Sequence, residues 1–207
     1  MLKSTGMPIS TDRIALARRL EVPVFNLMKD QLQTKLGRPT RGGVSGEPWK
    51  VVWDGAHLYK LLYFRRPQTA DANDQPLPDF ILKVDERPRL AVECKNWSVT
   101  SKWSKGSAKK QIIDRFTWLP ASCKRVVLAS HLQANGLGET MDIRRMLVDA
   151  DVKMCVLGHP VGYPPLTRER TYRRLAPIVS EWLSFIRKIT KRRKRIKKAQ
   201  KRLSQYV

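Results

Sequence analysis

Residues 78–97 read PDFILKVDERPRLAVECKNW, and this stretch decides the fold that we predict. It contains two short apolar runs, Phe80–Val84 and Leu90–Cys94, on either side of a turn expected at residues 85–88. Two such runs so close together predict an antiparallel hairpin. Charged residues stand at its open end, where Asp79 precedes the first run and Lys95 follows the second. Because charges rarely close a buried strand without a partner or a use, this end is the expected place for a functional site.

The side chains of Glu93 and Lys95 are expected on one face of their strand, because side chains alternate between the two faces. In an antiparallel hairpin, the first residues of one strand lie beside the last residues of the other. Asp79 therefore comes opposite the segment from Glu93 to Lys95. The spacing alone predicts that two carboxylates and one ammonium meet there. The alternative is a plain ion pair that ends a strand, since Glu-x-Lys is a common chance pattern.

Two carboxylates at one point suit Mg²⁺ or Mn²⁺, hard cations that prefer oxygen ligands and keep several waters. The backbone carbonyl of Cys94, between the two charged side chains, can add a third protein oxygen. A metal there acidifies a bound water and polarises a phosphodiester oxygen. The ammonium of Lys95 can orient or deprotonate that water, or neutralise the charge that builds in the transition state. The predicted reaction is metal-assisted hydrolysis of a phosphodiester.

The pattern PDFIL…AVECKNW resembles the core motif of the PD-(D/E)xK nuclease superfamily, above all the archaeal Holliday-junction resolvases and the Mrr-type restriction nucleases. The resemblance covers residues 20–130 and is concentrated in residues 78–111. It implies a restriction-endonuclease-like α/β fold and a Mg²⁺-dependent endonuclease. It also implies that Asp79 and Glu93 bind the metal, that Lys95 is the catalytic ammonium, and that DNA, rather than RNA, is the substrate.

Two further positions follow from the same resemblance. Several branches of the superfamily add a Gln from the next helix, and Gln111 stands where that residue would fall. An acidic residue on the first helix is also usual. Its expected place is near Asn26, where no acid stands, so the match departs from the family pattern here. Glu21 is the candidate first-helix acid and Asp30 the other nearby one, with Glu47 and Asp54 as further possibilities.

The chain is strongly basic over its whole length. It has 207 residues, and 41 Lys and Arg against 18 Asp and Glu give a net charge of +23. Residues 187–202 contain eleven of these cations and no acid, which leaves 23 − 11 = +12 on the rest. Such a field attracts polyanions, so a nucleic acid is the expected partner. In the tail the residues expected to contact phosphate are Lys191, Arg192, Arg193, Lys194, Arg195, Lys197 and Lys198. An import signal and docking on a larger nucleoprotein are the alternatives for the tail.

A second basic stretch follows the hairpin and carries two tryptophans. Trp97 and Trp103 can stack on bases, or they can be loop tryptophans that close over the core. The lysines expected to contact phosphates beside them are Lys102, Lys105, Lys109 and Lys110.

The order of predicted elements indicates a mixed sheet flanked by helices. A helix runs from residue 11 or 12 to Leu36, with a restart at Pro23. Strands are expected at 49–53 and 58–64, joined by the turn dipeptide Asp54-Gly55, and then at 80–84, 90–94, 125–129 and 152–157. Residues 98–107 are expected to form a loop, and helices are expected at 108–118 and 139–150. We divide the chain into a leader (1–11), a nuclease-like α/β domain (12–166) and a helix that is amphipathic and then strongly basic (167–207).

Targeting features are few. Cys94, Cys123 and Cys155 form no CxxC pair and are expected to be reduced core residues. No apolar run is long enough to span a membrane, and no secretory signal is apparent. We therefore expect a cytoplasmic, nucleoid-associated protein, nuclear if its host has a nucleus, with no membrane partner. A homodimer or a larger nucleoprotein complex is a further expectation.

Two other functions stay open at this point. The chain can be a catalytically silent nuclease fold that clamps nucleic acid or serves as an assembly subunit, and the missing acid near Asn26 favours this. It can also be a structural part of a ribonucleoprotein, with binding that falls steeply with salt and does not depend on a metal.

Overall fold

The computed structural model describes residues 11–36, 44–45, 50–55, 59–64, 77–96, 103–130, 137–158 and 168–186, and five positions further on (188, 195, 196, 199 and 200). The predicted leader lies almost wholly outside these residues. In the described part of the chain, no helix is both long and apolar enough to cross a membrane.

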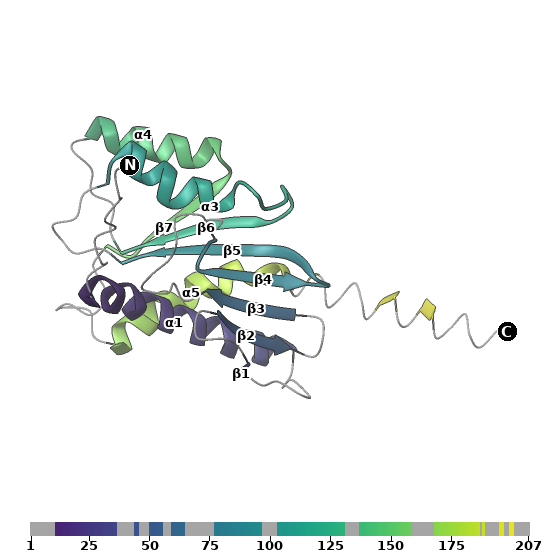
Figure 1. Ribbon diagram of the computed structural model, residues 1–207. Helices are drawn as coiled ribbons and strands as arrows, with labels where there is room; N and C mark the ends of the chain where they lie inside the picture. The colour runs from purple at the N-terminus through teal and green to yellow at the C-terminus, as the bar shows by residue number, and fades with distance from the viewer. Residues whose placement is uncertain are drawn as a thin grey trace, which may run out of the picture.

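A seven-stranded mixed sheet forms the centre of the protein (Figure 1). Its strands lie in chain order, with bounds β1 (Val44–Ser45), β2 (Lys50–Gly55), β3 (Tyr59–Phe64), β4 (Phe80–Val84), β5 (Arg87–Lys95), β6 (Lys124–Ala129) and β7 (Val152–Val156). Strands β1 to β5 pair antiparallel, whereas β5, β6 and β7 pair parallel. The predicted α/β class with a mixed, helix-flanked sheet is confirmed.

The hairpin of β4 and β5 is present, with a tighter turn than the sequence predicted. Asp85 and Glu86 alone form the turn, and their φ angles are 54° and 59°. A two-residue turn with positive φ matches the twist of the flanking strands, so the pairing continues to Arg87 and Pro88. The second strand is therefore longer than predicted, and its last residue is Lys95.

The turn predicted at Asp54-Gly55 is wrong. Both residues belong to β2, where Asp54 pairs with Lys60 and Gly55 pairs with Tyr59. The dipeptide is a common turn signal, but here the ladder to β3 extends through it. The connection to β3 falls at residues 56–58, which lie outside the described residues.

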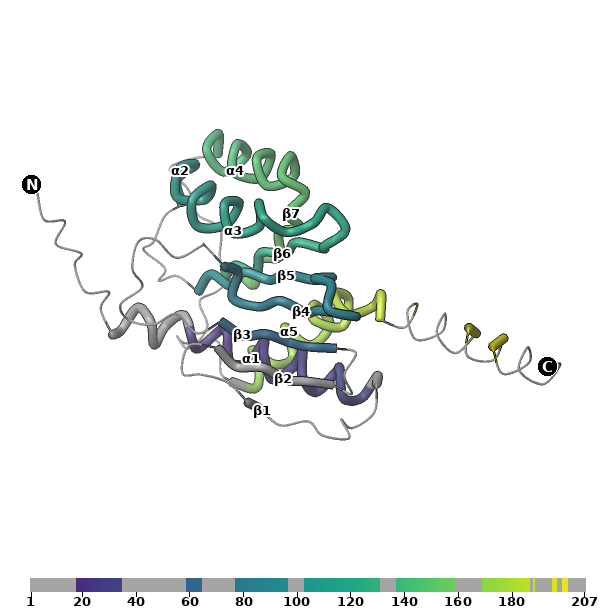
Figure 2. The backbone as a smooth tube through the Cα atoms, turned by 45° about the vertical axis from the view of Figure 1, so that its right-hand side comes forward, coloured from purple at the N-terminus to yellow at the C-terminus, as the bar shows by residue number. Residues whose placement is uncertain are grey.

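Helices cover both faces of the sheet (Figures 1 and 2). On one face, α1 (Thr11–Leu36) and α5 (Arg168–Trp182) pack on a core that includes Phe80, Val92 and Leu128. Pro23 lies inside α1, so the predicted restart does not break the helix.

On the other face, a helical segment made of α2 (Lys105–Ala108), a π turn (Lys109–Ile113) and α3 (Asp114–Phe116) lies with α4 (Leu137–Asp149) over a core that includes Ala91 and Val127. This helical segment begins three residues before its predicted start, because Ser104 caps it.

Helix α5 runs antiparallel to β7. In the first half of α5, Arg174 donates to the carbonyl of Leu157, just after β7. Near its end, Glu181 pairs with Lys153, at the beginning of β7. The described part of α5 therefore runs from the end of the sheet that carries Lys95 towards the opposite end. Of the predicted basic helix, Arg195 is described and exposed, and the other tail cations proposed for phosphate contact lie outside the described residues.

Candidate active site

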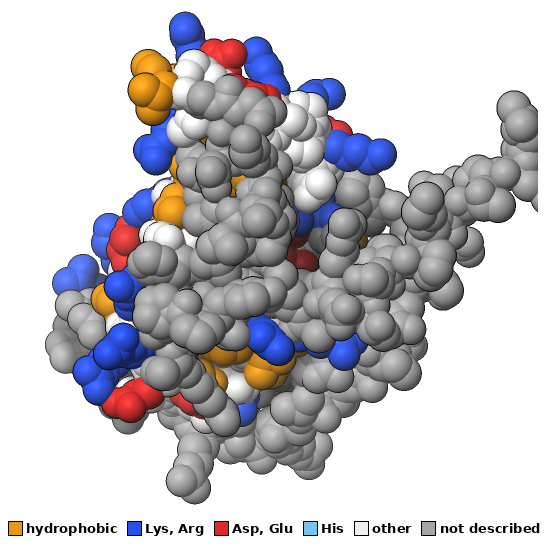
Figure 3. Space-filling view, turned by 90° about the vertical axis from the view of Figure 1, so that its left-hand side faces the viewer, with side chains coloured by type: hydrophobic (Ala, Val, Ile, Leu, Met, Phe, Trp, Pro, Cys, Tyr) orange, Lys and Arg blue, Asp and Glu red, His pale blue; other side chains and the backbone are white. Residues whose placement is uncertain are grey.

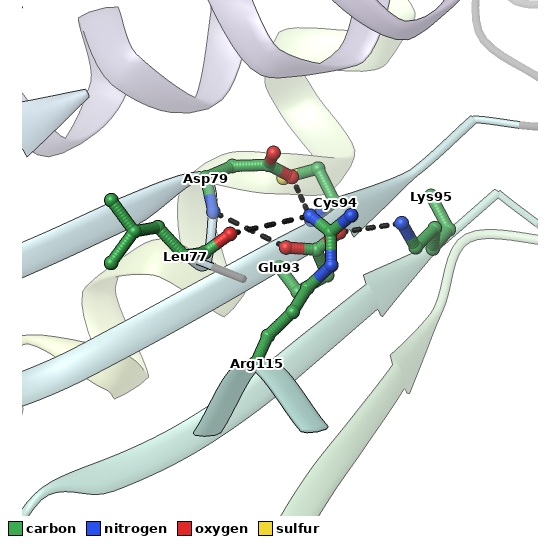
Figure 4. A network of polar contacts seen from close by, with 6 residues as sticks. All are labelled: Leu77, Asp79, Glu93, Cys94, Lys95 and Arg115. Atoms are coloured by element: carbon green, nitrogen blue, oxygen red, sulfur yellow. Dashed lines mark hydrogen bonds and ion pairs between the residues drawn. The ribbon is translucent and has the colours of Figure 1, made fainter. Parts of the chain in front are cut away.

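Asp79 and Glu93 are held together by crosswise backbone contacts at the open end of the hairpin (Figure 4). The amide of Asp79 donates to Glu93 Oε2 over 3.2 Å. The amide of Cys94 donates to Asp79 Oδ2 over 2.6 Å. Each carboxylate thus binds backbone of the strand that carries the other, as expected if Asp79 lies opposite Glu93 one step beyond the Phe80–Val92 pair. The predicted proximity of the two residues is confirmed.

Glu93 is fully buried and is bound by two cations. Lys95 Nζ lies 2.5 Å from Glu93 Oε1, and Arg115 Nη1 lies 2.8 Å from the same oxygen. Both cations are themselves buried. Burying a carboxylate without a partner is costly, and the two cations offset part of this cost. The structure therefore brings together the predicted Asp79, Glu93 and Lys95, and it adds a fourth charge.

Arg115 is the residue that sequence reasoning missed. It lies on α3, directly after the π turn, and also donates to the carbonyl of Leu77, at 3.3 Å. Its helical stripe gave the available signal, because an arginine between Ile112 and Phe116 stands next to the residues that face the sheet. A cation in that place needs an acceptor on the sheet, and the charged end of the hairpin supplies one.

Gln111, which the family resemblance assigned to the site, stands one turn before Arg115 and is exposed. Its role stays a prediction. Arg115, in the same helical segment, contacts Glu93.

The predicted nucleic-acid contacts divide into three groups. Lys105, Lys109 and Lys110 are exposed, as phosphate contacts require, and Lys105 lies 3.7 Å from Asp142. Base stacking by Trp103 is corrected, because this side chain is fully buried in the core beneath α2. The alternative reading, a tryptophan that closes over the core, fits its position. Trp97 and Lys102 lie outside the described residues.

Glu21 reaches the same end of the sheet from α1. Tyr63 on β3 donates its hydroxyl to Glu21 Oε2 at 2.7 Å. Burial raises the pKa of the Tyr63 hydroxyl above its ordinary value, and the negative charges of Glu21 and Asp79 add to this effect. Burial likewise raises the pKa of the Cys94 thiol, with further contributions from Asp79, Glu21 and Glu93. The carboxylates of Asp79, Glu21 and Glu93 therefore all contribute to the raised pKa of Cys94 on β5. Asn26, at the position where the family pattern expects an acid, carries no charge and donates to the hydroxyl of Tyr172.

Asp79 and Glu93 offer a metal ion two carboxylates, fewer than a complete set of protein ligands. The negative charge of Asp79 contributes to the raised pKa values of Tyr63 and Cys94, which lie in the core under α1. Glu93, by contrast, is bound by Arg115 from the other side of the hairpin. Among the described residues, no group of three or more His, Cys, Asp or Glu side chains is placed to hold a metal ion. Two carboxylates with waters and a substrate phosphate are a usual environment for Mg²⁺, and this smaller set is the one that the hairpin end offers.

The surface at this end of the sheet carries many cations. Figure 3 views the end at which β5 finishes, and Lys and Arg side chains are scattered over several of its described parts. Arg170, Arg173 and Arg174 near the start of α5 are exposed, and Lys109 and Lys110 are exposed on the π turn. This distribution agrees with the basic charge of the body of the chain.

No protein-family model matches this chain, and neither a curated protein nor a solved structure is significantly similar to it. The geometry of the hairpin end and the sequence motif are therefore the observations that bear on function.

Proposed function

We propose that this chain is a metal-dependent nuclease of the PD-(D/E)xK type with a restriction-endonuclease-like fold, and that it hydrolyses phosphodiester bonds in DNA. The observation that carries the proposal is the buried Glu93, which is bound by Lys95 and adjoins Asp79 at the end of one hairpin. An ionic cluster of this kind is expensive to bury, and such clusters are common at functional sites.

Each residue has a role in the proposed reaction. The carboxylates of Asp79 and Glu93, with the carbonyl of Cys94, would hold Mg²⁺ or Mn²⁺, which when bound supplies an activated water and a Lewis acid. Lys95 would orient that water or stabilise the extra negative charge on the phosphate. Its ammonium is preorganised for this role, because it is buried and fixed by Glu93. The exposed lysines of α2 and the π turn would contact the nucleic-acid backbone.

The direct test is cleavage of labelled linear, branched and circular DNAs and of RNAs in Mn²⁺ or Mg²⁺. We expect a metal-dependent product from DNA, and we expect Glu93→Gln to lower the cleavage rate at least about a hundredfold while nucleic-acid binding survives. Glutamine keeps the volume of the side chain and removes its charge. If Glu93→Gln cut as fast as the parent chain, the site would be wrong.

A second candidate is a nuclease fold without hydrolysis that clamps nucleic acid within a larger complex. It is favoured by the two cations on Glu93 Oε1 and by the lack of a three-ligand group among the described residues. Calorimetric titration separates the two functions. The clamp binds nucleic acid and takes up neither Mg²⁺ nor Mn²⁺, with or without the nucleic acid present.

A further inference from the structure

Side chains of both charges stand together at the hairpin end before any ligand is present. Asp79 and Glu93 contribute two negative charges, and Lys95 and Arg115 contribute two positive charges. All four residues are buried, with exposed fractions of the whole residue between 0% and 9%. Glu21 adds a third carboxylate on the α1 side, where Tyr63 binds it.

A divalent cation would add two positive charges to a site that already contains two buried cations. With the metal, the four side chains named above would carry a net charge of +2, or +1 when Glu21 is counted with them. Repulsion between buried like charges is large, because the interior screens them weakly. A phosphodiester supplies the missing negative charge. Metal and phosphate are therefore expected to bind better together than either does alone.

Arg115 is placed to control this coupling. Its guanidinium touches the carboxylate that is proposed to bind the metal, and it is held there by the carbonyl of Leu77. A guanidinium also forms two parallel hydrogen bonds with a phosphate, so it has a second anionic partner of the right shape. Lys95 carries the same charge, but its ammonium is a point donor that is already assigned to the water or the developing charge.

We propose that Arg115 makes metal binding depend on the nucleic-acid substrate: it neutralises Glu93 in the free protein, and it turns to the substrate phosphate when the metal binds. This inference rests on the proposed nuclease function and adds a regulation to the same site. It explains why a carboxylate that binds a metal is covered by two cations. By linkage, the metal strengthens DNA binding by the same factor by which DNA strengthens metal binding.

The test is calorimetric titration of the full chain with Mn²⁺, alone and in the presence of a short phosphorothioate DNA duplex, which keeps the charge of a phosphodiester. We expect the duplex to tighten Mn²⁺ binding to the parent chain at least about tenfold. Arg115→Gln should bind Mn²⁺ about tenfold more tightly than the parent in the absence of DNA, because the competing cation is gone. The factor by which the duplex tightens Mn²⁺ binding should be correspondingly smaller for Arg115→Gln than for the parent chain.

Two variants serve as controls. Arg125→Gln removes another partly buried arginine, one that donates to the carbonyls of Leu119 and Ala150, and it lowers the net charge equally. It should leave both Mn²⁺ affinities unchanged. Arg115→Lys keeps the charge and loses the planar donor pair. Its Mn²⁺ affinity without DNA should stay within about twofold of the parent value, while its affinity with DNA should fall at least about threefold.

Several outcomes overturn the inference. If Arg115→Gln and Arg125→Gln have the same Mn²⁺ affinities while the parent binds Mn²⁺ and cleaves DNA, the coupling role fails and the nuclease function stands. If the parent takes up no Mn²⁺ in either condition, both proposals fail. Should Arg115→Gln not fold, Arg115→Lys decides, and unchanged affinity in the presence of DNA would refute the role of Arg115.

Discussion

Two of the Glu–Lys pairs in the described part of the chain have the same N–O distance but very different surroundings. Lys95 Nζ and Glu93 Oε1 are 2.5 Å apart at the open end of the β4–β5 hairpin, and their side chains are 8% and 0% exposed. Lys60 Nζ and Glu86 Oε1 are also 2.5 Å apart, but Glu86 lies in the turn at the other end, and these side chains are 35% and 63% exposed. Distance alone does not distinguish the two pairs, whereas burial does.

The difference in burial indicates that the Glu93–Lys95 pair costs more free energy to place than the Lys60–Glu86 pair. An exposed pair gains little, because water screens it and its side chains lose freedom. A buried pair must offset the loss of hydration, and apolar residues of the same volume are often as stable or more stable. Donors that include the amide of Asp79, Lys95 and Arg115 offset this loss at Glu93. A cluster that is costly to bury and lies at the end of a strand is better explained by function than by stability.

The strongest test of this comparison is the stability of Glu93→Ala against Glu86→Ala. Removing Glu93 leaves two buried cations without their shared carboxylate, so we expect a loss of about 3–5 kcal/mol in the free energy of unfolding. Denaturant unfolding followed by circular dichroism measures it. Glu86→Ala is the matched control and should unfold at nearly the same midpoint as the parent. Equal losses in the two variants would show that burial does not separate the pairs.

A smaller effect is expected at Tyr63, which ties Glu21 to the same end of the sheet. Tyr63→Phe should lower the free energy of unfolding by about 1 kcal/mol at neutral pH, because Glu21 loses a donor. The pKa of Tyr63 is raised in the folded protein, so its hydroxyl ionises first in the unfolded chain. Stability should therefore fall with pH above about 10, the usual tyrosine pKa.

The variant without the hydroxyl should lose part of this alkaline slope. Unfolding midpoints of both proteins between neutral pH and pH 11 or so test the sign. Parallel pH profiles of Tyr63→Phe and the parent would contradict the role of Tyr63.

The smallest effect is expected from Glu86 in acid. Its hydrogen bond with Lys60 lowers the pKa of the Glu86 carboxyl below the ordinary value. Any stability from this pair is therefore present above the usual carboxyl pKa and is lost as the pH falls through the lowered value. Because the pair is exposed, Glu86→Gln should change the pH dependence of thermal unfolding only slightly. A large change confined to acid pH would mean that exposed pairs matter more here than we propose.

The sequence predicted the hairpin end well, since its features are local. A strand repeats every two residues and a hairpin brings fixed positions opposite one another, so the proximity of Asp79, Glu93 and Lys95 follows from spacing. The same local reasoning failed at Asp54-Gly55, where cross-strand pairing continues through a common turn signal.

Arg115 and Trp103 were beyond local reasoning. Whether a helical residue reaches the site depends on how the helix packs and on its exact rotation, and the π turn at Lys109–Ile113 shifts the residues that follow it. Assigning Gln111 from the family pattern takes no account of this shift. Trp103 stands in a stretch rich in Lys and Ser that indicates a surface loop, yet the packing of α2 on the sheet buries it.

The most direct test of the account compares the two lysines in one cleavage assay. Lys95→Ala and Lys60→Ala each remove the cation of a 2.5 Å pair with a glutamate, and each lowers the net charge by one. Initial rates of DNA cleavage in Mn²⁺ should fall at least about a hundredfold for Lys95→Ala, with DNA binding retained, and should stay near the parent rate for Lys60→Ala. Equal rates for the two variants, or no metal-dependent cleavage by the parent chain on any DNA, would contradict the claim that the buried hairpin end is the active site of a nuclease.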